Sequence, residues 1–161
     1  MTMTAMFRPS LEPTRGASDA AQDLATQREE WQGRMQDSVF LGLGAKGIFD
    51  DLGSIFQECR SANWDGYGAV PVRPETLINT RRFLLALPWG TPPPAIGAEP
   101  DGHLTLEWHR SPRRTLSISV SPDGDLHFAA LLGPRTRYGT ELFVNDVPRV
   151  ILDLIDEISI V

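Results

Sequence analysis

Apolar and polar residues alternate through the C-terminal half of the chain. The period of two is clear in segments 104–108, 116–120 and 126–132. Such patterns, separated by tight turns, are typical of antiparallel strands that bury one face. Shorter extended segments at 95–99 and 138–144 complete a predicted antiparallel β-meander of about five strands.

Two copies of one turn signal separate these segments, Pro100-Asp101-Gly102 and Pro122-Asp123-Gly124. Proline presets φ for a type I turn, and glycine takes the left-handed position that follows it. With Ser111-Pro112-Arg113 at the tip of the middle hairpin, each apolar residue meets an apolar one, as Trp108 meets Leu116. A slip of one residue would break this match, so the sequence specifies the register.

Helical periodicity appears on both sides of these strands. Apolar residues recur at helical spacing in segments 49–61, 75–87 and 147–158, and the last of these carries the strongest stripe. We expect these helices to pack on one face of the sheet, which gives an α+β fold. Residues that favour helix N-termini stand near two of the starts: Asp50 and Asp51 for the first helix, and Asn145 or Asp146 for the last.

The N-terminal part of the chain lacks these strong patterns. It begins with a polar segment that contains two prolines and shows no period, as a disordered tail does. A helix with a thin apolar stripe that includes Trp31 is expected next, followed by a Gly-rich connection. The predicted organisation is a disordered tail (1–17), an N-terminal helix with its Gly-rich connection (18–48) and a single α+β domain (49–161).

Composition narrows the function classes. The 161 residues, 41% of them hydrophobic, suffice for one domain with its own core. A net charge of −6 argues against nucleic acid as the partner, because sequence-independent binding needs an excess of Lys and Arg. We expect no membrane span and no secretory signal. A lone cysteine, Cys59, falls in an apolar helical stripe, so we expect a core residue in a reducing, cytoplasmic compartment.

Residues 42–47 match the G-x-G-x-x-G pattern, whose glycines let a backbone approach a pyrophosphate at a helix N-terminus. The apolar run before it has only three residues, and no second parallel strand follows within a βαβ length. Asp50 and Asp51 would also place negative charge where the phosphate should bind. We therefore interpret the segment as a Gly-rich connection and predict no cofactor.

The polar face of the predicted sheet is a candidate ligand face, made of Thr105, Glu107, His109, Ser117, Ser119 and His127. His103 lies at the opposite end of its strand from His109, so we expect no three ligands to converge and predict no metal site. A serine beside His127 offers a nucleophile and a base. Serines on a flat strand lack the strained turn and oxyanion donors of acyl transfer, so we predict no catalytic residue and favour a solvated polar face.

The segment Trp64-Asp65-Gly66-Tyr67-Gly68-Ala69 places two aromatic residues in a Gly-rich turn. In one interpretation Trp64 and Tyr67 close the core between two helices while Asp65 bonds turn amides. In the other, the aromatic residues anchor a protein partner, since Trp and Tyr dominate interface energetics.

Two motifs together resemble a group of uncharacterised small bacterial proteins. They are W-D-G-Y-G-A-x-P, which begins at Trp64, and P-D-G-x-L-x-L-E-W, which ends at Trp108. The resemblance covers about residues 52–154 and leaves the N-terminal segment out. It implies a bacterial origin and a single domain, and it transfers no catalytic residue.

Two function hypotheses from different classes follow. The first is a non-enzymatic protein-binding module, such as an antitoxin, an immunity-type protein or a regulatory subunit. Its partner-binding residues would be Trp31, Trp64, Asp65 and Tyr67. The alternative is a small-ligand-binding protein or an enzyme that uses the Ser/Thr/His face. The strand at 138–144 has few charges, which makes pairing with its twin in a homodimer a further expectation.

Overall fold

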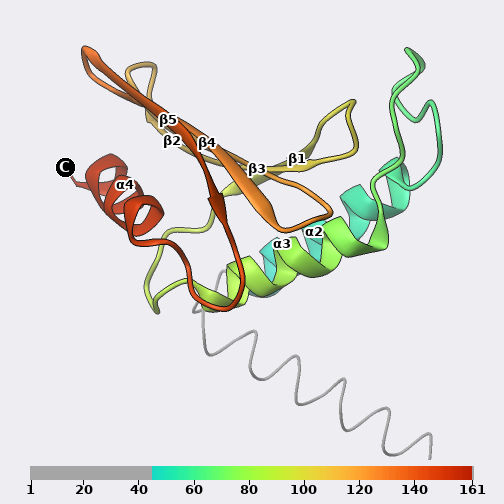
Figure 1. Ribbon diagram of the computed structural model, residues 1–161, viewed down its shortest axis with the longest axis horizontal. Coiled ribbons are helices and arrows are strands. Elements are labelled where there is room, and N and C mark those ends of the chain that lie inside the picture. The colour runs from blue at the N-terminus through green and yellow to red at the C-terminus, as the bar shows by residue number, and fades with distance from the viewer. Residues whose placement is uncertain (1–44, 161) are drawn as a thin grey trace, which may run out of the picture. The chain divides into compact units, whose positions relative to one another are not determined.

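The computed structural model describes residues 45–160 (Figure 1). The predicted tail, the helix with Trp31 and the start of the Gly-rich connection lie outside the described residues. The described residues belong to one compact unit. Its elements, in chain order, are α2 (Ala45–Cys59), α3 (Pro74–Ala86), β1 (Ala95–Ala98), β2 (Leu104–Ser111), β3 (Arg114–Val120), β4 (Asp125–Leu132), β5 (Arg135–Leu142) and α4 (Arg149–Ser159).

The five strands form one antiparallel sheet in the order β1-β2-β3-β4-β5, which confirms the predicted meander. The predicted register is also confirmed. Trp108 pairs with Leu116, and Ile118 lies between Leu106 on one side and Phe128 on the other. Several side chains on this face are completely buried: Leu104, Leu106, Leu116, Ile118, Val120 and Leu126.

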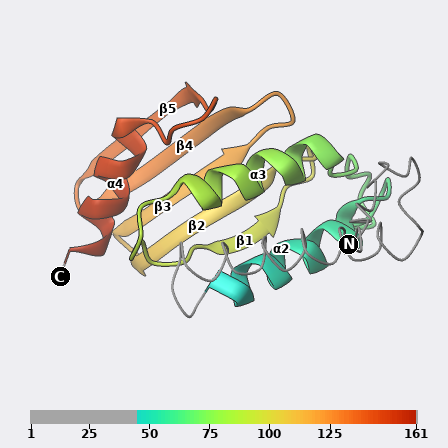
Figure 2. The same ribbon diagram turned by 90° about the horizontal axis from the view of Figure 1, so that it is seen from below.

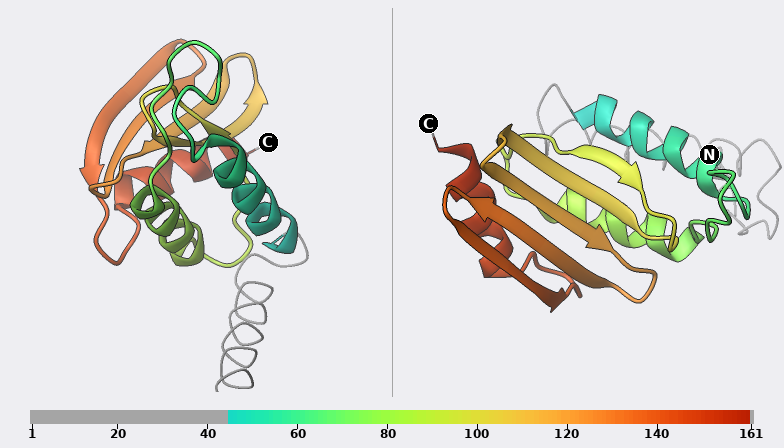
Figure 3. Two further views of the ribbon diagram at one scale, coloured as in Figure 1. Left: turned by 90° about the vertical axis from the view of Figure 1, so that its right-hand side faces the viewer. Right: turned by 90° about the horizontal axis from the view of Figure 1, so that it is seen from above.

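The three described helices contact the sheet from one side, as predicted (Figures 2 and 3). α2 packs along β1, α3 lies against β2 and β3, and α4 crosses β2, β3 and β4. None of the described helices covers the other side, which faces the viewer in the right-hand view of Figure 3; we call it the open face. Within residues 45–160, no helix combines the length and the apolar character that crossing a membrane requires.

The start of α2 differs from the prediction. The chain is already helical at Ala45, so Asp50 and Asp51 lie inside the helix and not at its N-terminus. The reason is that the buried Ile48 continues the apolar stripe of Leu52 by one further turn. The last part of the predicted Gly-rich connection is therefore helical.

The start of α4 also differs from the prediction. The helix begins at Arg149 after Pro148, and neither Asn145 nor Asp146 caps it. The side-chain oxygen of Asn145 instead accepts a hydrogen bond from Arg82 of α3, at 3.3 Å. Pro148 is the N-cap residue, and its side chain has no group that could cap the helix; its carbonyl accepts hydrogen bonds from the N–H groups of Ile151 and Leu152.

The fifth strand lies closer to the fourth along the chain than predicted. β5 begins at Arg135, directly opposite Leu132 of β4, instead of at residue 138. The two residues between them, Gly133 and Pro134, form the connection, and the φ of +65° at Gly133 permits so tight a turn. Pairing with β4 therefore starts immediately after the turn.

Replacing the buried aromatic ring of α3 should destabilise the whole fold. Phe83 is completely buried, and its ring meets that of Phe143 edge-on, with 5.6 Å between centroids. We expect Phe83→Ala to lower the free energy of unfolding by about 3–5 kcal/mol in urea denaturation. Ile78→Ala on the exposed side of the same helix is the control and should change it by about 0.5 kcal/mol or less. Similar losses in the two variants would contradict this packing.

The buried thiol at the end of α2 should be protected. Burial of Cys59, and then the nearby charge of Glu58, raises the pKa of the thiol. The folded state thus binds the thiol proton more tightly than the unfolded state does. The resulting contribution to folding stability is complete below the ordinary thiol pKa of about 8.5, and it is lost as pH rises through the raised pKa. The difference in unfolding free energy between the wild type and Cys59→Ala should therefore narrow as pH rises above the raised pKa of the thiol.

Burial should also slow the reaction of Cys59 with alkylating agents. Iodoacetamide should alkylate Cys59 slowly in the folded protein at pH 8, and labelling as fast as in urea would contradict its burial.

Candidate functional site

The loop between α2 and α3, residues 63–69, is held by its own side chains; we call it the aromatic loop. Oδ1 of Asp65 accepts hydrogen bonds from the backbone N–H groups of Tyr67 at 2.8 Å and Ala69 at 3.1 Å. Oδ1 of Asn63 accepts one from the N–H of Gly68 at 2.7 Å. The N–H of Asn63 donates to the carbonyl of Ala69, which closes the loop. These bonds fix the loop backbone in one conformation.

The two aromatic residues of the loop have different environments. Trp64 is half-buried against the hydrophobic core, and its Nε1 donates a hydrogen bond to the carbonyl of Val70 at 3.0 Å. The side chain of Tyr67 is 94% exposed. The first interpretation of this segment, in which both aromatic residues close the core, is confirmed for the core contact of Trp64 and for the hydrogen bonds of Asp65 to turn amides. Tyr67 does not close the core.

The aromatic loop packs against the turn between β1 and β2. The N–H of Val70, just after the loop, donates to the carbonyl of Pro100 in the turn at 2.8 Å. Gly102 has a φ of +88°, and a Cβ placed there would lie 2.8 Å from the carbonyl oxygen of Pro71. Only glycine permits both the turn and this close approach. The two motifs of the sequence analysis thus meet in one surface, residues 63–71 and 99–103, which we call the loop–turn surface.

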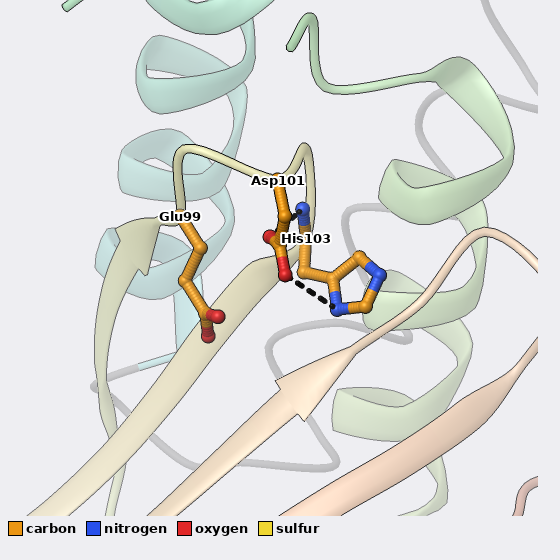
Figure 4. Close-up of side chains that lie close together, drawn as sticks. All are labelled: Glu99, Asp101 and His103. Atoms are coloured by element: carbon orange, nitrogen blue, oxygen red, sulfur yellow. Dashed lines mark hydrogen bonds and ion pairs between the residues drawn. The ribbon is translucent and has the colours of Figure 1, made fainter. Parts of the chain in front are cut away.

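Three polar side chains converge at this turn (Figure 4). Ligand-type atoms of Glu99, Asp101 and His103 lie within 4.8 Å of one another. The expectation that no three such groups converge is therefore wrong. Strand positions alone place His103 far from His109, whereas Glu99, Asp101 and His103 alternate around a turn that directs all three side chains to one side. The E-x-D-x-H spacing across a Pro-Asp-Gly turn was the available signal.

The contacts inside this cluster limit its chemistry. Oγ of Ser119 lies 3.0 Å from Nδ1 of His103, and Oδ2 of Asp101 approaches the same nitrogen at 3.6 Å. A Ser-His-Asp relay needs the serine and the carboxylate on opposite nitrogens of the imidazole. The Thr105 hydroxyl donates a hydrogen bond to Glu99. A cation would have to displace these hydroxyl contacts, so the geometry favours neither a proton relay nor a ready ligand set.

Part of the candidate ligand face adjoins this cluster. Thr105, Ser119 and His127 are cross-strand neighbours on β2, β3 and β4. The ring of His127 stacks on that of His103, with 5.8 Å between centroids and 9° between planes, and its Nδ1 lies 2.9 Å from Oγ1 of Thr140. These residues thus lie side by side near the loop–turn surface, and each bonds a different partner: Thr105 with Glu99, Ser119 with His103 and His127 with Thr140.

The remaining residues of the candidate ligand face lie farther along the strands. Glu107 pairs with Ser117, and Nδ1 of His109 lies 3.1 Å from the Thr115 hydroxyl. A cavity of about 310 Å³ reaches Glu107 and His109, but Thr105, Ser119 and His127 do not line it. Its other walls come from Pro92, Pro93, Ala95, Trp108, Arg110, Ile158 and Ser159. Of the six predicted residues, Glu107 and His109 therefore line this cavity, whereas Thr105, Ser119 and His127 lie nearer the β1–β2 turn.

The contact between the turn and the loop can be tested at two glycines. Both Gly102 and Gly66 have positive φ, but a Cβ at residue 66 would meet nothing within 4 Å. Gly66→Ala should therefore cost only backbone strain, about 1–2 kcal/mol of unfolding free energy. Gly102→Ala should cost more, because the Pro71 carbonyl must also move, and it should speed amide hydrogen exchange at Val70. Equal costs for the two variants would show that the loop and turn are not in contact.

Comparison with protein-family models, with curated proteins and with solved structures finds no match to this chain. The resemblance of the two motifs to a bacterial group stays a prediction from sequence. The function therefore has to be argued from the geometry of the described residues.

Proposed function

We propose that this chain is a non-enzymatic protein-binding module that contacts its partner through the loop–turn surface, the role of an antitoxin, an immunity-type protein or a regulatory subunit. The observation that carries the proposal is the exposure of Tyr67 on a loop whose backbone is fixed by side-chain hydrogen bonds. Exposing a large ring to water brings the free chain no stability, whereas burying it in a partner does.

A ring on a rigid support suits binding. Association costs free energy for every segment that becomes ordered, and a loop that is already ordered avoids most of that cost. Tyrosine also supplies a large contact area with few rotatable bonds, and it is enriched among residues that dominate interface energetics. Asp65 and Asn63 contribute indirectly, because their hydrogen bonds hold the backbone that presents Tyr67.

The charge next to Tyr67's loop indicates the kind of partner. Glu99 and Asp101 lie on the adjoining turn, and the chain carries a net charge of −6. A partner surface that complements both features has a pocket for the tyrosine ring bordered by Arg or Lys side chains. We therefore expect a basic protein surface as the partner.

The alternative hypothesis, a small-ligand site or an enzyme on the open face, has one supporting observation. His103, Ser119 and His127 form a contiguous polar group there. The approach of both Ser119 and Asp101 to the same imidazole nitrogen argues against acyl chemistry. Of this alternative, the geometry is compatible with the binding of a small polar ligand.

Partner binding should depend on Tyr67, whereas the stability of the fold should not. The test captures partners of the tagged full chain from a native lysate, identifies them by mass spectrometry and measures their affinity for the purified protein. We expect Tyr67→Ala to weaken binding of the partner by at least about 30-fold while the melting temperature stays unchanged, because the ring is almost fully exposed in the free protein.

The matched control is Trp89→Ala. This residue is also an exposed aromatic, at 77%, but it lies on the connector between α3 and β1. It should leave the affinity unchanged. Capture of no stoichiometric partner, or equal affinity for the wild type and Tyr67→Ala, would contradict the proposal. Loss of a small-molecule ligand on Ser119→Ala or His127→Ala would support the alternative instead.

A further inference from the structure

The outer edge of β5 carries exposed apolar side chains. β5 is the last strand of the sheet, and no described strand pairs with its outer side. Tyr138 and Leu142 are 82% and 60% exposed on the open face. The strand is eight residues long, contains no proline and pairs with β4 without a bulge. Long regular edges of this kind are templates for pairing with another strand.

The hydrogen-bond phase of β5 shows which of its residues offer backbone groups to a new strand. The N–H of Phe143 donates to the carbonyl of Gly124 at 2.9 Å, just beyond the end of β4 pairing. Antiparallel bonding alternates along a strand, so the odd-numbered residues of β5 bond to β4. The backbone groups of the even-numbered residues point outward: Thr136, Tyr138, Thr140 and Leu142.

The charges on β5 are complementary to those on a second, antiparallel copy of β5. In an antiparallel pair of two β5 strands with Gly139 at the centre, Arg137 of each copy lies opposite Glu141 of the other. In the same register Tyr138 lies opposite Thr140, and Thr136 lies opposite Leu142, so outward-facing residues meet outward-facing residues. Opposite charges directly across a pair of strands are favourable, and like charges are not.

The neighbouring registers that keep the hydrogen-bond phase are poorer. A centre at Tyr138 places Leu142 opposite Pro134, which has no N–H to donate. A centre at Arg137 places that residue opposite its own copy. A centre at Thr140 leaves Arg137 opposite Phe143 and Glu141 opposite Gly139, so no charge is paired. The register centred on Gly139 is therefore the one that satisfies both the backbone and the charges.

We propose that a second copy of this chain pairs antiparallel with β5 across a two-fold axis at Gly139. The axis is perpendicular to the sheet, so the helices of both copies lie on one side and the two open faces join. Tyr138 of each copy then has Tyr138 and Leu142 of the other as diagonal neighbours, which shields the exposed rings from water. Arg137 keeps Glu157 of its own α4, at 3.8 Å, as a second carboxylate neighbour. The dimer goes beyond the proposed function, because it presents two loop–turn surfaces at once.

Sedimentation of the full chain across a concentration series tests the proposal. The wild type should sediment at twice its 17.8 kDa mass. Arg137→Glu and Glu141→Arg should each weaken the dimer by at least about 100-fold, because each places two like-charged pairs across the interface. The double variant Arg137→Glu/Glu141→Arg should restore the dimer, because it exchanges the two charges.

Glu157→Gln is the matched control, since it removes the ion pairs of Arg137 and Arg135 within one copy and leaves the interface charges in place. It should remain dimeric. Circular dichroism must show the same fold for every variant that is scored. A monomeric wild type, a dimer that persists in both single variants, or a double variant that stays monomeric would each overturn the proposal.

Discussion

Cross-strand packing of apolar side chains on β2, β3 and β4 is the interaction on which the rest of the structure depends. Pairs such as Leu104 with Val120 and Leu106 with Ile118 are completely buried beneath the helices. Because side chains alternate between the faces of a strand, burying one set forces the residues between them onto the open face. The set of residues on the open face is thus a consequence of the core, and their being gathered on one face needs no function to explain it.

The same register places the features that we assign to binding. It sets the β1–β2 turn where Gly102 can meet Pro71, and through that contact it supports the loop that presents Tyr67. It also sets the phase of β5, and therefore which backbone groups face outward at the edge. The proposed partner surface and the proposed dimer edge consequently rest on one framework, although they lie on different parts of it.

The sequence predicted the sheet well where one face of a strand is uniformly apolar. It predicted a fifth strand but misplaced its bounds, because the helix-facing side of β5 carries Arg135, Arg137 and Glu141 and so shows no apolar period. There, Glu157 of α4 balances the arginines, and this is a tertiary contact that no local pattern reveals. At the candidate site, the sequence identified the loop but not which of its aromatic residues is exposed. That difference depends on how the loop packs against the core and against the β1–β2 turn. Most of the residues of both are distant from the loop along the chain, so no local pattern reveals these contacts.

The alternating strand directions also sort the charges of the turns. The turns that carry Asp101 and Asp123 lie at one end of the sheet, and those beside Arg113 and Arg135 lie at the other. The turns themselves therefore carry acidic residues at one end of the sheet and arginines at the other, where Glu157 of α4 offsets part of the positive charge. In the field of the basic surface proposed as the partner, such a charge distribution would turn the molecule during diffusion, so that its acidic end leads. That end carries the loop–turn surface, and molecules would arrive already oriented for contact, an advantage that salt would screen away.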